Sequence, residues 1–171
     1  MRNYIVGIFI LLSLVSKAQL PSDWLGHYKG ELTSVNLEGK ESRFDMELII
    51  SEDKDSSYNF TIIYASGEVR QERAYQLIPD GKNHYLLDEQ NGIVLDISQG
   101  KDRLVSFFNV QESYLHVCYI FTKKGMRFEL TSSVKGKTNA KTTNENGEDI
   151  PAVYSYKTTS FQFAALKKLK K

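Results

Sequence analysis

The sequence has little cysteine, little proline and no excess of charge of either sign. Its 171 residues include one cysteine and three prolines, and 22 basic residues stand against 21 acidic ones. A single cysteine cannot form an internal disulfide, so no disulfide framework holds the fold. A near-neutral chain gives no global argument for nucleic-acid binding. With 41% hydrophobic and 25% charged residues, the composition is globular and excludes the disordered and collagen-like classes.

Motifs typical of enzymes and metalloproteins are also missing. The three histidines, His27, His84 and His116, fall on three different predicted strands, and no histidine and cysteine residues share metal-ligand spacing. The sequence has no Gly-x-Ser-x-Gly elbow and no phosphate-binding loop. We therefore predict no catalytic residue, no metal and no cofactor, and an enzyme is the least favoured class.

The one long hydrophobic run lies at the N-terminus. Arg2 precedes an almost wholly apolar stretch, residues 4–15, and Ser16 and Ala18 are small residues at the positions that a signal peptidase inspects. About a dozen apolar residues are too few for a spanning helix, which needs roughly 20. We expect residues 1–18 to be a cleaved signal peptide, with the mature chain lacking a transmembrane segment and exported to the periplasm or beyond. A membrane anchor is the alternative.

Alternation of apolar and polar residues dominates the rest of the chain. In residues 44–51, for example, Phe44, Met46 and Leu48 alternate with polar neighbours. A period of two predicts β-strands with one buried face. Only residues 161–171 leave the choice between helix and strand open. The predicted strands are residues 27–37, 43–51, 57–65, 69–78, 83–89, 93–98, 102–110, 113–122, 126–134 and 153–164.

Short turn sequences separate most of these strands. Asp80-Gly81 and Asn91-Gly92 are typical of hairpin turns, because both central residues take positive φ. Short connections pair neighbouring strands antiparallel. A closed barrel also leaves no exposed edge strand. We therefore predict one all-β domain over residues 19–171, an antiparallel up-and-down β-barrel of about ten strands. A two-sheet β-sandwich is the alternative.

One connection is long and polar. Residues 135–152 contain almost nothing to bury, and loops beyond roughly 12–15 residues are usually functional or disordered. We expect either a disordered segment or a mobile flap over one mouth of the barrel.

The first predicted strand starts within Trp24-Leu25-Gly26-His27-Tyr28-Lys29-Gly30. This start resembles that of calycin-type barrels, namely lipocalins, fatty-acid-binding proteins and nitrobindin-like proteins. Those families begin with Gly-x-Trp, and here Gly26-His27-Tyr28 stands in its place. The resemblance implies a lipocalin-like barrel whose closed end is plugged by Tyr28 and whose interior binds a small apolar or amphipathic molecule. Besides the tyrosine in place of tryptophan, the chain departs from these families in other ways: its last predicted strand offers Lys157 and no arginine. No two-helix lid separates the first two strands, and no histidine follows His116 to ligate haem.

The candidate ligand-binding residues are polar and aromatic side chains on predicted inner faces. Gln71, Arg73 and Tyr75 share a strand face with apolar neighbours. An internal arginine beside a tyrosine binds a carboxylate, as the resemblance to fatty-acid binders implies. The alternative is that Arg73 faces solvent or pairs with an acidic neighbour. The full candidate set is Tyr28, Tyr64, Gln71, Arg73, Tyr75, Phe108 and Tyr119.

Two functions follow from these expectations. The first is an exported barrel that binds a small apolar or amphipathic ligand in its interior. The second is an interaction protein of the cell envelope, without a small-molecule ligand, in which residues 135–152 or the outer barrel face contact a protein partner that the sequence does not identify.

Overall fold

The structure is a computed structural model that describes residues 19–136, 146–148 and 153–170. The predicted signal peptide and most of the predicted long loop lie outside these residues. Within them, no helix is long and apolar enough to cross a membrane.

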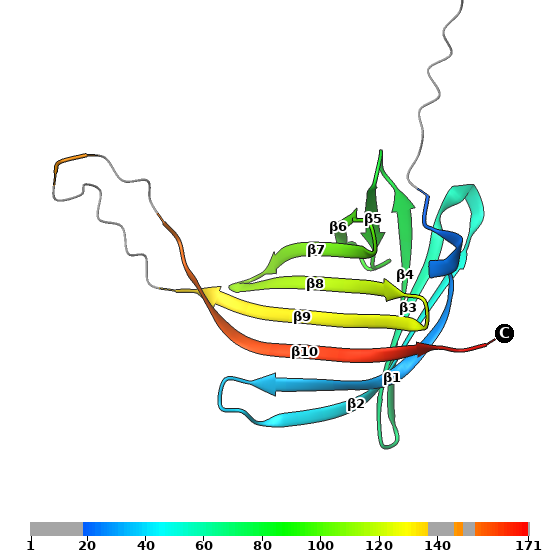
Figure 1. The fold of residues 1–171 in the computed structure, drawn as a ribbon, viewed down its shortest axis with the longest axis horizontal. Coiled ribbons are helices and arrows are strands. Elements are labelled where there is room, and N and C mark those ends of the chain that lie inside the picture. Colours follow the sequence, from blue (N-terminus) through cyan, green and yellow to red (C-terminus); the bar gives the residue numbers. More distant parts are fainter. Residues whose placement is uncertain (1–18, 137–145, 149–152, 171) are drawn as a thin grey trace, which may run out of the picture.

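The described residues form ten antiparallel strands that close into a barrel, in the order β1-β10-β9-β8-β7-β6-β5-β4-β3-β2 (Figure 1). The predicted all-β barrel is confirmed, and the sandwich is excluded, because β1 pairs with both β2 and β10. Two short 3₁₀ helices, η1 (Ser22–Trp24) and η2 (Lys54–Ser56), accompany the strands. The strands are β1 (Gly26–Asn36), β2 (Glu41–Glu52), β3 (Tyr58–Ser66), β4 (Val69–Pro79), β5 (His84–Asp88), β6 (Val94–Gln99), β7 (Arg103–Val110), β8 (Ser113–Thr122), β9 (Gly125–Lys135) and β10 (Tyr156–Lys168).

The last strand differs from its predicted position. Strand β10 begins at Tyr156 and continues to Lys168, whereas the sequence analysis placed it at 153–164 and left residues 161–171 undecided. Ala164 and Leu166 are buried in the core, so the inward alternation continues almost to the C-terminus. Pairing with both β9 and β1 settles the conformation of a segment that local propensity leaves ambiguous.

One end of the barrel is filled by aromatic side chains. Trp24 stacks on Phe121 with ring centroids 4.2 Å apart, and the Tyr28 hydroxyl donates to the Trp24 carbonyl at 2.8 Å. The backbone N–H of Leu20 donates to the Tyr58 hydroxyl at 3.1 Å. These residues are all buried, so we call this the closed end. Tyr28 thus lies where the resemblance to calycins implies.

The barrel wall is incomplete toward the other end. Strand β4 has eleven residues, but only Gln76–Pro79 pair with the short β5. Strands β6 and β7 share only two paired positions, Ser98 with Val105 and Gln99 with Leu104. The edge of β4 from Val69 to Tyr75 and the edge of β7 from Ser106 to Val110 therefore lack a strand partner on that side. The β5–β6 hairpin closes only the part of the wall nearer the closed end, where β5 pairs with Gln76–Pro79 (Figure 1).

Candidate functional site

A cavity of about 90 Å³ lies inside the half of the barrel away from the closed end. Its floor is aromatic: Tyr119 packs edge-on against Phe60, with ring centroids 5.2 Å apart, and at a tilt against Phe128, with ring centroids 5.4 Å apart. Ligand pockets usually measure roughly 300–1,000 Å³, so this cavity holds only part of a typical ligand. The lining residues are Ile62, Tyr64, Arg73, Tyr75, Leu87, Glu89, Leu95, Ile97, Ser106, Phe108, Val117, Tyr119, Phe128 and Leu130.

Arg73 is the one cation among these lining residues. It shares the inner face of β4 with Tyr75, two residues further along, because successive side chains of a strand alternate between faces. Its guanidinium carbon lies 5.5 Å from the ring centroid of Tyr64, a diagonal neighbour on β3, and its Nη2 donates to the Gln71 amide oxygen at 3.3 Å. The Arg73 side chain is exposed at the rim while it faces the cavity.

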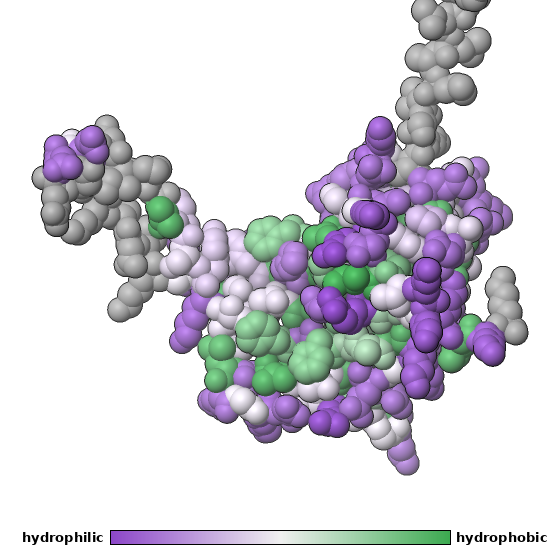
Figure 2. Space-filling model, viewed as in Figure 1, coloured by the Kyte–Doolittle hydropathy of each residue, from purple (hydrophilic) through white to green (hydrophobic). Residues whose placement is uncertain are grey.

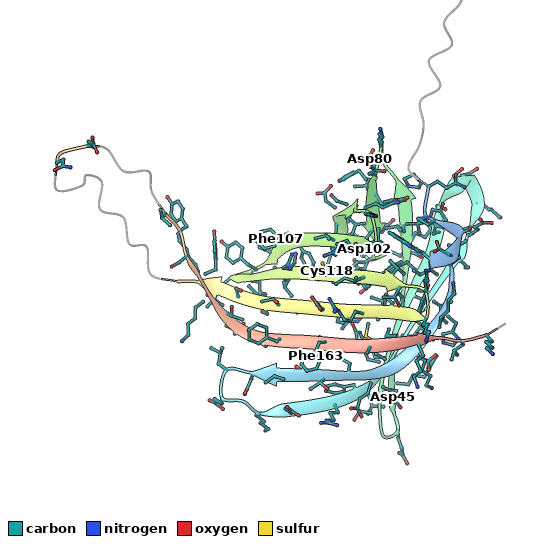
Figure 3. All side chains as sticks on the ribbon, viewed as in Figure 1. Asp45, Asp80, Asp102, Phe107, Cys118 and Phe163 are labelled. Atoms are coloured by element: carbon teal, nitrogen blue, oxygen red, sulfur yellow. The ribbon has the colours of Figure 1, made fainter. Side chains whose placement is uncertain are left out.

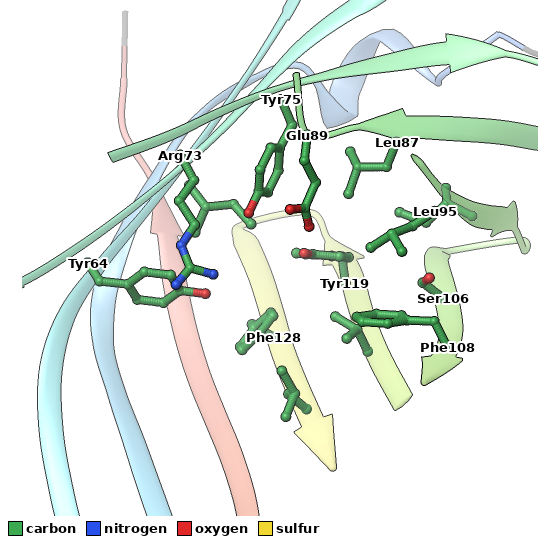
Figure 4. A pocket seen from close by; sticks show the side chains of 14 residues that line it. Tyr64, Arg73, Tyr75, Leu87, Glu89, Leu95, Ser106, Phe108, Tyr119 and Phe128 are labelled. Carbon is green, nitrogen blue, oxygen red and sulfur yellow. The ribbon is translucent and has the colours of Figure 1, made fainter. Parts of the chain in front are cut away.

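Tyrosine hydroxyls surround the guanidinium. Figure 4 shows the hydroxyls of Tyr64, Tyr75 and Tyr119 converging toward Arg73. Burial raises the pKa of Tyr64 to about 12, opposed by the nearby positive charge of Arg73. Burial also raises the pKa of Tyr75 and, strongly, that of Tyr119. All three hydroxyls are therefore protonated at neutral pH and are available as hydrogen-bond donors and acceptors.

Glu89 adds a carboxylate that the candidate set lacked. It follows β5 at the start of a tight turn, in which its backbone N–H donates to the Ile93 carbonyl at 3.0 Å, and Gln90 and Gly92 take positive φ. The Asn91 amide donates to the Glu89 carboxylate at 3.2 Å. The signal was present in the sequence: Glu89 is two residues after the buried Leu87, so the strand alternation directs it inward.

An open groove of about 460 Å³ lies at the unpaired edge of β4, lined by Glu72, Arg73, Ala74, Tyr75, Glu89 and Asn91. Three of these residues, Arg73, Tyr75 and Glu89, also line the cavity. We call the passage that these three residues line the side opening. They stand where β4 has lost its β5 partner, so the interior and the groove meet at the same side chains.

The remaining candidates have different positions. Phe108 lines the cavity from β7. Gln71 lies beyond it at the rim and contacts Arg73. Tyr28 is 1% exposed at the closed end and is absent from the cavity lining, which corrects the expectation that it shares one cavity with the others. The physical reason is the direction in which β1 runs. This strand starts at the closed end, so Tyr28, its first inward-facing aromatic residue, packs there and not in the cavity.

Other titratable clusters give no comparable site. On the exposed side of β5 and β6, His84 Nδ1 lies 3.5 Å from Asp80 Oδ2, and His84 Nε2 lies 3.3 Å from Asp96 Oδ1. Within the described part of the chain, no group of three or more histidine, cysteine, aspartate or glutamate residues is arranged to hold a metal ion.

No family model and no curated protein matches the chain. Solved structures with a similar fold include a protein of unknown function from the DUF3598 family of Nostoc punctiforme, at 10% identity and a TM-score of 0.58, over 94% of this chain and 54% of that one. The chain therefore spans about half the length of that protein. Another is the S-type phycobiliprotein lyase CPES of Guillardia theta, at 10% identity and a TM-score of 0.56, over 87% of this chain and 90% of that one. These likenesses concern the fold, and a ten-stranded antiparallel barrel is consistent with a calycin-like fold.

Proposed function

We propose that the protein binds a small amphipathic molecule, with the apolar part in the barrel cavity and an anionic group on Arg73. The observation that carries this proposal is the convergence of one guanidinium and three protonated tyrosine hydroxyls over an aromatic cavity (Figure 4). A guanidinium donates two parallel hydrogen bonds to a carboxylate, and tyrosine hydroxyls add further donors. The fold shared with a phycobiliprotein lyase is compatible with a barrel that binds a small ligand.

Octanoate and octanol test this function, since the two probes share a tail and differ in charge. We expect octanoate to bind more tightly, and Arg73→Ala to weaken it by about 1.5–3 kcal/mol, the contribution of a hydrogen bond to a charged group. Octanol binding is expected to change little. Isothermal titration calorimetry measures both affinities.

Arg70→Ala is the matched control. Arg70 lies on the same strand, points to the outer side and pairs with Glu72 at 3.1 Å. An equal loss of octanoate binding in the two arginine variants contradicts the proposed role of Arg73. Absence of binding of either probe contradicts the function itself.

Export is part of the proposal. Leu20, two residues after the predicted cleavage position, is buried in the barrel core, so the part of the fold that the structure describes reaches close to that position. N-terminal sequencing of the protein purified from the periplasm or the medium is expected to start at Gln19. A product that retains Met1 in the cytoplasm contradicts export.

A second function, binding of a protein partner in the cell envelope, is favoured by the outer barrel face. Phe107, Phe161 and Phe163 are 66%, 47% and 50% exposed, and apolar side chains gather on the face of β7–β10 (Figures 2 and 3). Phe107 and Phe161 lie on one cross-strand row through His116 and Thr131. Exposed apolar patches are typical of protein interaction sites.

Cross-linking in intact cells distinguishes this second function from the first. A cross-linked species that is lost in Phe163→Ser and retained in Arg73→Ala supports the protein partner. A urea unfolding midpoint of Phe163→Ser close to that of the unchanged protein shows that the variant is folded.

A further inference from the structure

The side opening carries both signs of charge without an ion pair. Arg73 and Glu89 line the cavity and the groove alike, and Glu72 lines the groove. Among the residues that the structure describes, no ion pair within 4.0 Å joins Arg73 to Glu89. Arg73 donates to the neutral amide of Gln71, and Glu89 accepts from the neutral amide of Asn91. Both charges therefore face a shared space with neutral partners only.

The two charges also act on the same hydroxyls. After burial, which is the largest cause of the raised pKa of Tyr75, Glu89 raises that pKa further and Arg73 lowers it. The pKa of Tyr119 responds to the same two charges in the same directions. Coulombic interactions weaken with distance, so these effects indicate that both charges lie near the Tyr75 and Tyr119 hydroxyls. Figure 4 shows Arg73 and Glu89 on opposite sides of the Tyr75 hydroxyl.

We propose that the ligand is a zwitterionic amphiphile whose head group lies in the side opening, with its anionic group on Arg73 and its ammonium group on Glu89. This inference rests on the proposed function and adds the chemistry of the head group. A purely anionic head is repelled by Glu89, and a purely cationic head is repelled by Arg73. A head group that carries both charges pairs its anionic group with Arg73 and its ammonium group with Glu89 at the same time.

The volumes of the two spaces support the same orientation. The cavity of about 90 Å³ is smaller than an engineered apolar cavity of roughly 150 Å³ that binds benzene, so only the end of an apolar chain enters it and the rest of the chain lies in the side opening. The groove of about 460 Å³ is open and is lined by Glu72, Asn91 and the three residues of the side opening. The ligand therefore crosses the wall between β4 and the β5–β6 turn, with its polar end outside.

Three probes with one carbon skeleton test the inference: octanoate, octylamine and 2-aminooctanoate, which are anionic, cationic and zwitterionic at neutral pH. Calorimetry of the full mature chain measures the dissociation constant of each probe. The constant for 2-aminooctanoate is expected to be at least about tenfold lower than that of either other probe, because one additional hydrogen bond to a charged group contributes that much.

Two substitutions assign the contacts. Glu89→Gln is expected to weaken the binding of 2-aminooctanoate and of octylamine by about tenfold or more. It is expected to strengthen the binding of octanoate, because the repulsion between two carboxylates is removed. Arg73→Gln is expected to weaken the binding of octanoate and of 2-aminooctanoate, and to strengthen the binding of octylamine. Glu31→Gln is the matched control, since Glu31 lies on the outer face of β1 and pairs with Arg43.

The outcomes separate this inference from the function on which it rests. Octanoate binding that depends on Arg73, without tighter binding of 2-aminooctanoate, overturns the zwitterionic head group and leaves the proposed function standing. Unchanged or tighter 2-aminooctanoate binding in Glu89→Gln also overturns the inference. Absence of binding of all three probes overturns both.

Discussion

Individual tyrosines show how the barrel uses polar residues in its interior. The Tyr28 hydroxyl at the closed end has a fixed partner in the Trp24 carbonyl, so it stabilises the plug. The hydroxyls of Tyr64, Tyr75 and Tyr119 instead surround Arg73 and the cavity. The strand alternation predicts that these residues point inward. Which hydroxyl is engaged within the fold and which faces the cavity depends on the end of the barrel that each one occupies, and a pattern of period two does not carry that information.

Alkaline titration tests this description of the buried tyrosines. Tyr28 and Tyr64 have pKa values raised by burial to about 12, above the value of about 10 in an unfolded chain. A folded-state pKa above the unfolded one gives stability that is complete below pH 10 and is lost as the pH rises through about 12. We expect the urea midpoint to fall over this window, and tyrosinate absorbance to appear later in the folded protein than in urea.

A variant makes the titration specific. The positive charge of Arg73 lowers the pKa of Tyr64, so Arg73→Ala is expected to delay tyrosinate formation further, whereas Arg70→Ala is not. Identical absorbance curves in folded and urea-unfolded protein are incompatible with buried tyrosines.

At the scale of strands and turns, the sequence predicts positions well and contacts poorly. Period-two alternation placed nine strands within about two residues of their observed bounds, and turn residues marked their ends. Lys124-Gly125 illustrates the limit. In the sequence, Gly125 falls between the predicted strands 113–122 and 126–134, but in the structure a Cβ at this position would overlap the backbone oxygen of Leu166. That contact comes from β10, about forty residues later in the chain, and only the closed barrel creates it.

The substitution Gly125→Ala tests how tightly β10 packs on the β8–β9 hairpin. The added methyl group overlaps a backbone oxygen, so β9 or β10 must shift, and overpacking of this kind costs about 1–3 kcal/mol. Gly100→Ala is the control, because its Cβ would meet the flexible Arg103 side chain at 3.1 Å. Urea unfolding measures both variants. Equal stability of Gly125→Ala and the wild type argues against close packing of β10 at this point.

On the scale of the whole molecule, the side opening is a consequence of unequal strand lengths. Strands β5 and β6 have five and six residues, between a β4 of eleven and a β7 of eight. The sequence indicates a shorter hairpin, and the meander predicts the closed barrel. However, a short strand opens the wall only where its long neighbours extend past it on the same side, and this depends on registers that are set by closure.

Hydrogen exchange tests whether this wall is open in solution. Along β4, Gln76 and Leu77 pair with strands on both sides, whereas Val69–Tyr75 pair only with β3. Alternate amides of Val69–Tyr75 therefore lack a strand acceptor and are expected to exchange much faster than those of Gln76 and Leu77 on the same strand. Strand β8, paired along its length with β7 and β9, provides a second reference. Uniform protection along β4 would mean that another segment covers the edge, and the ligand would then have to enter the cavity by a different route.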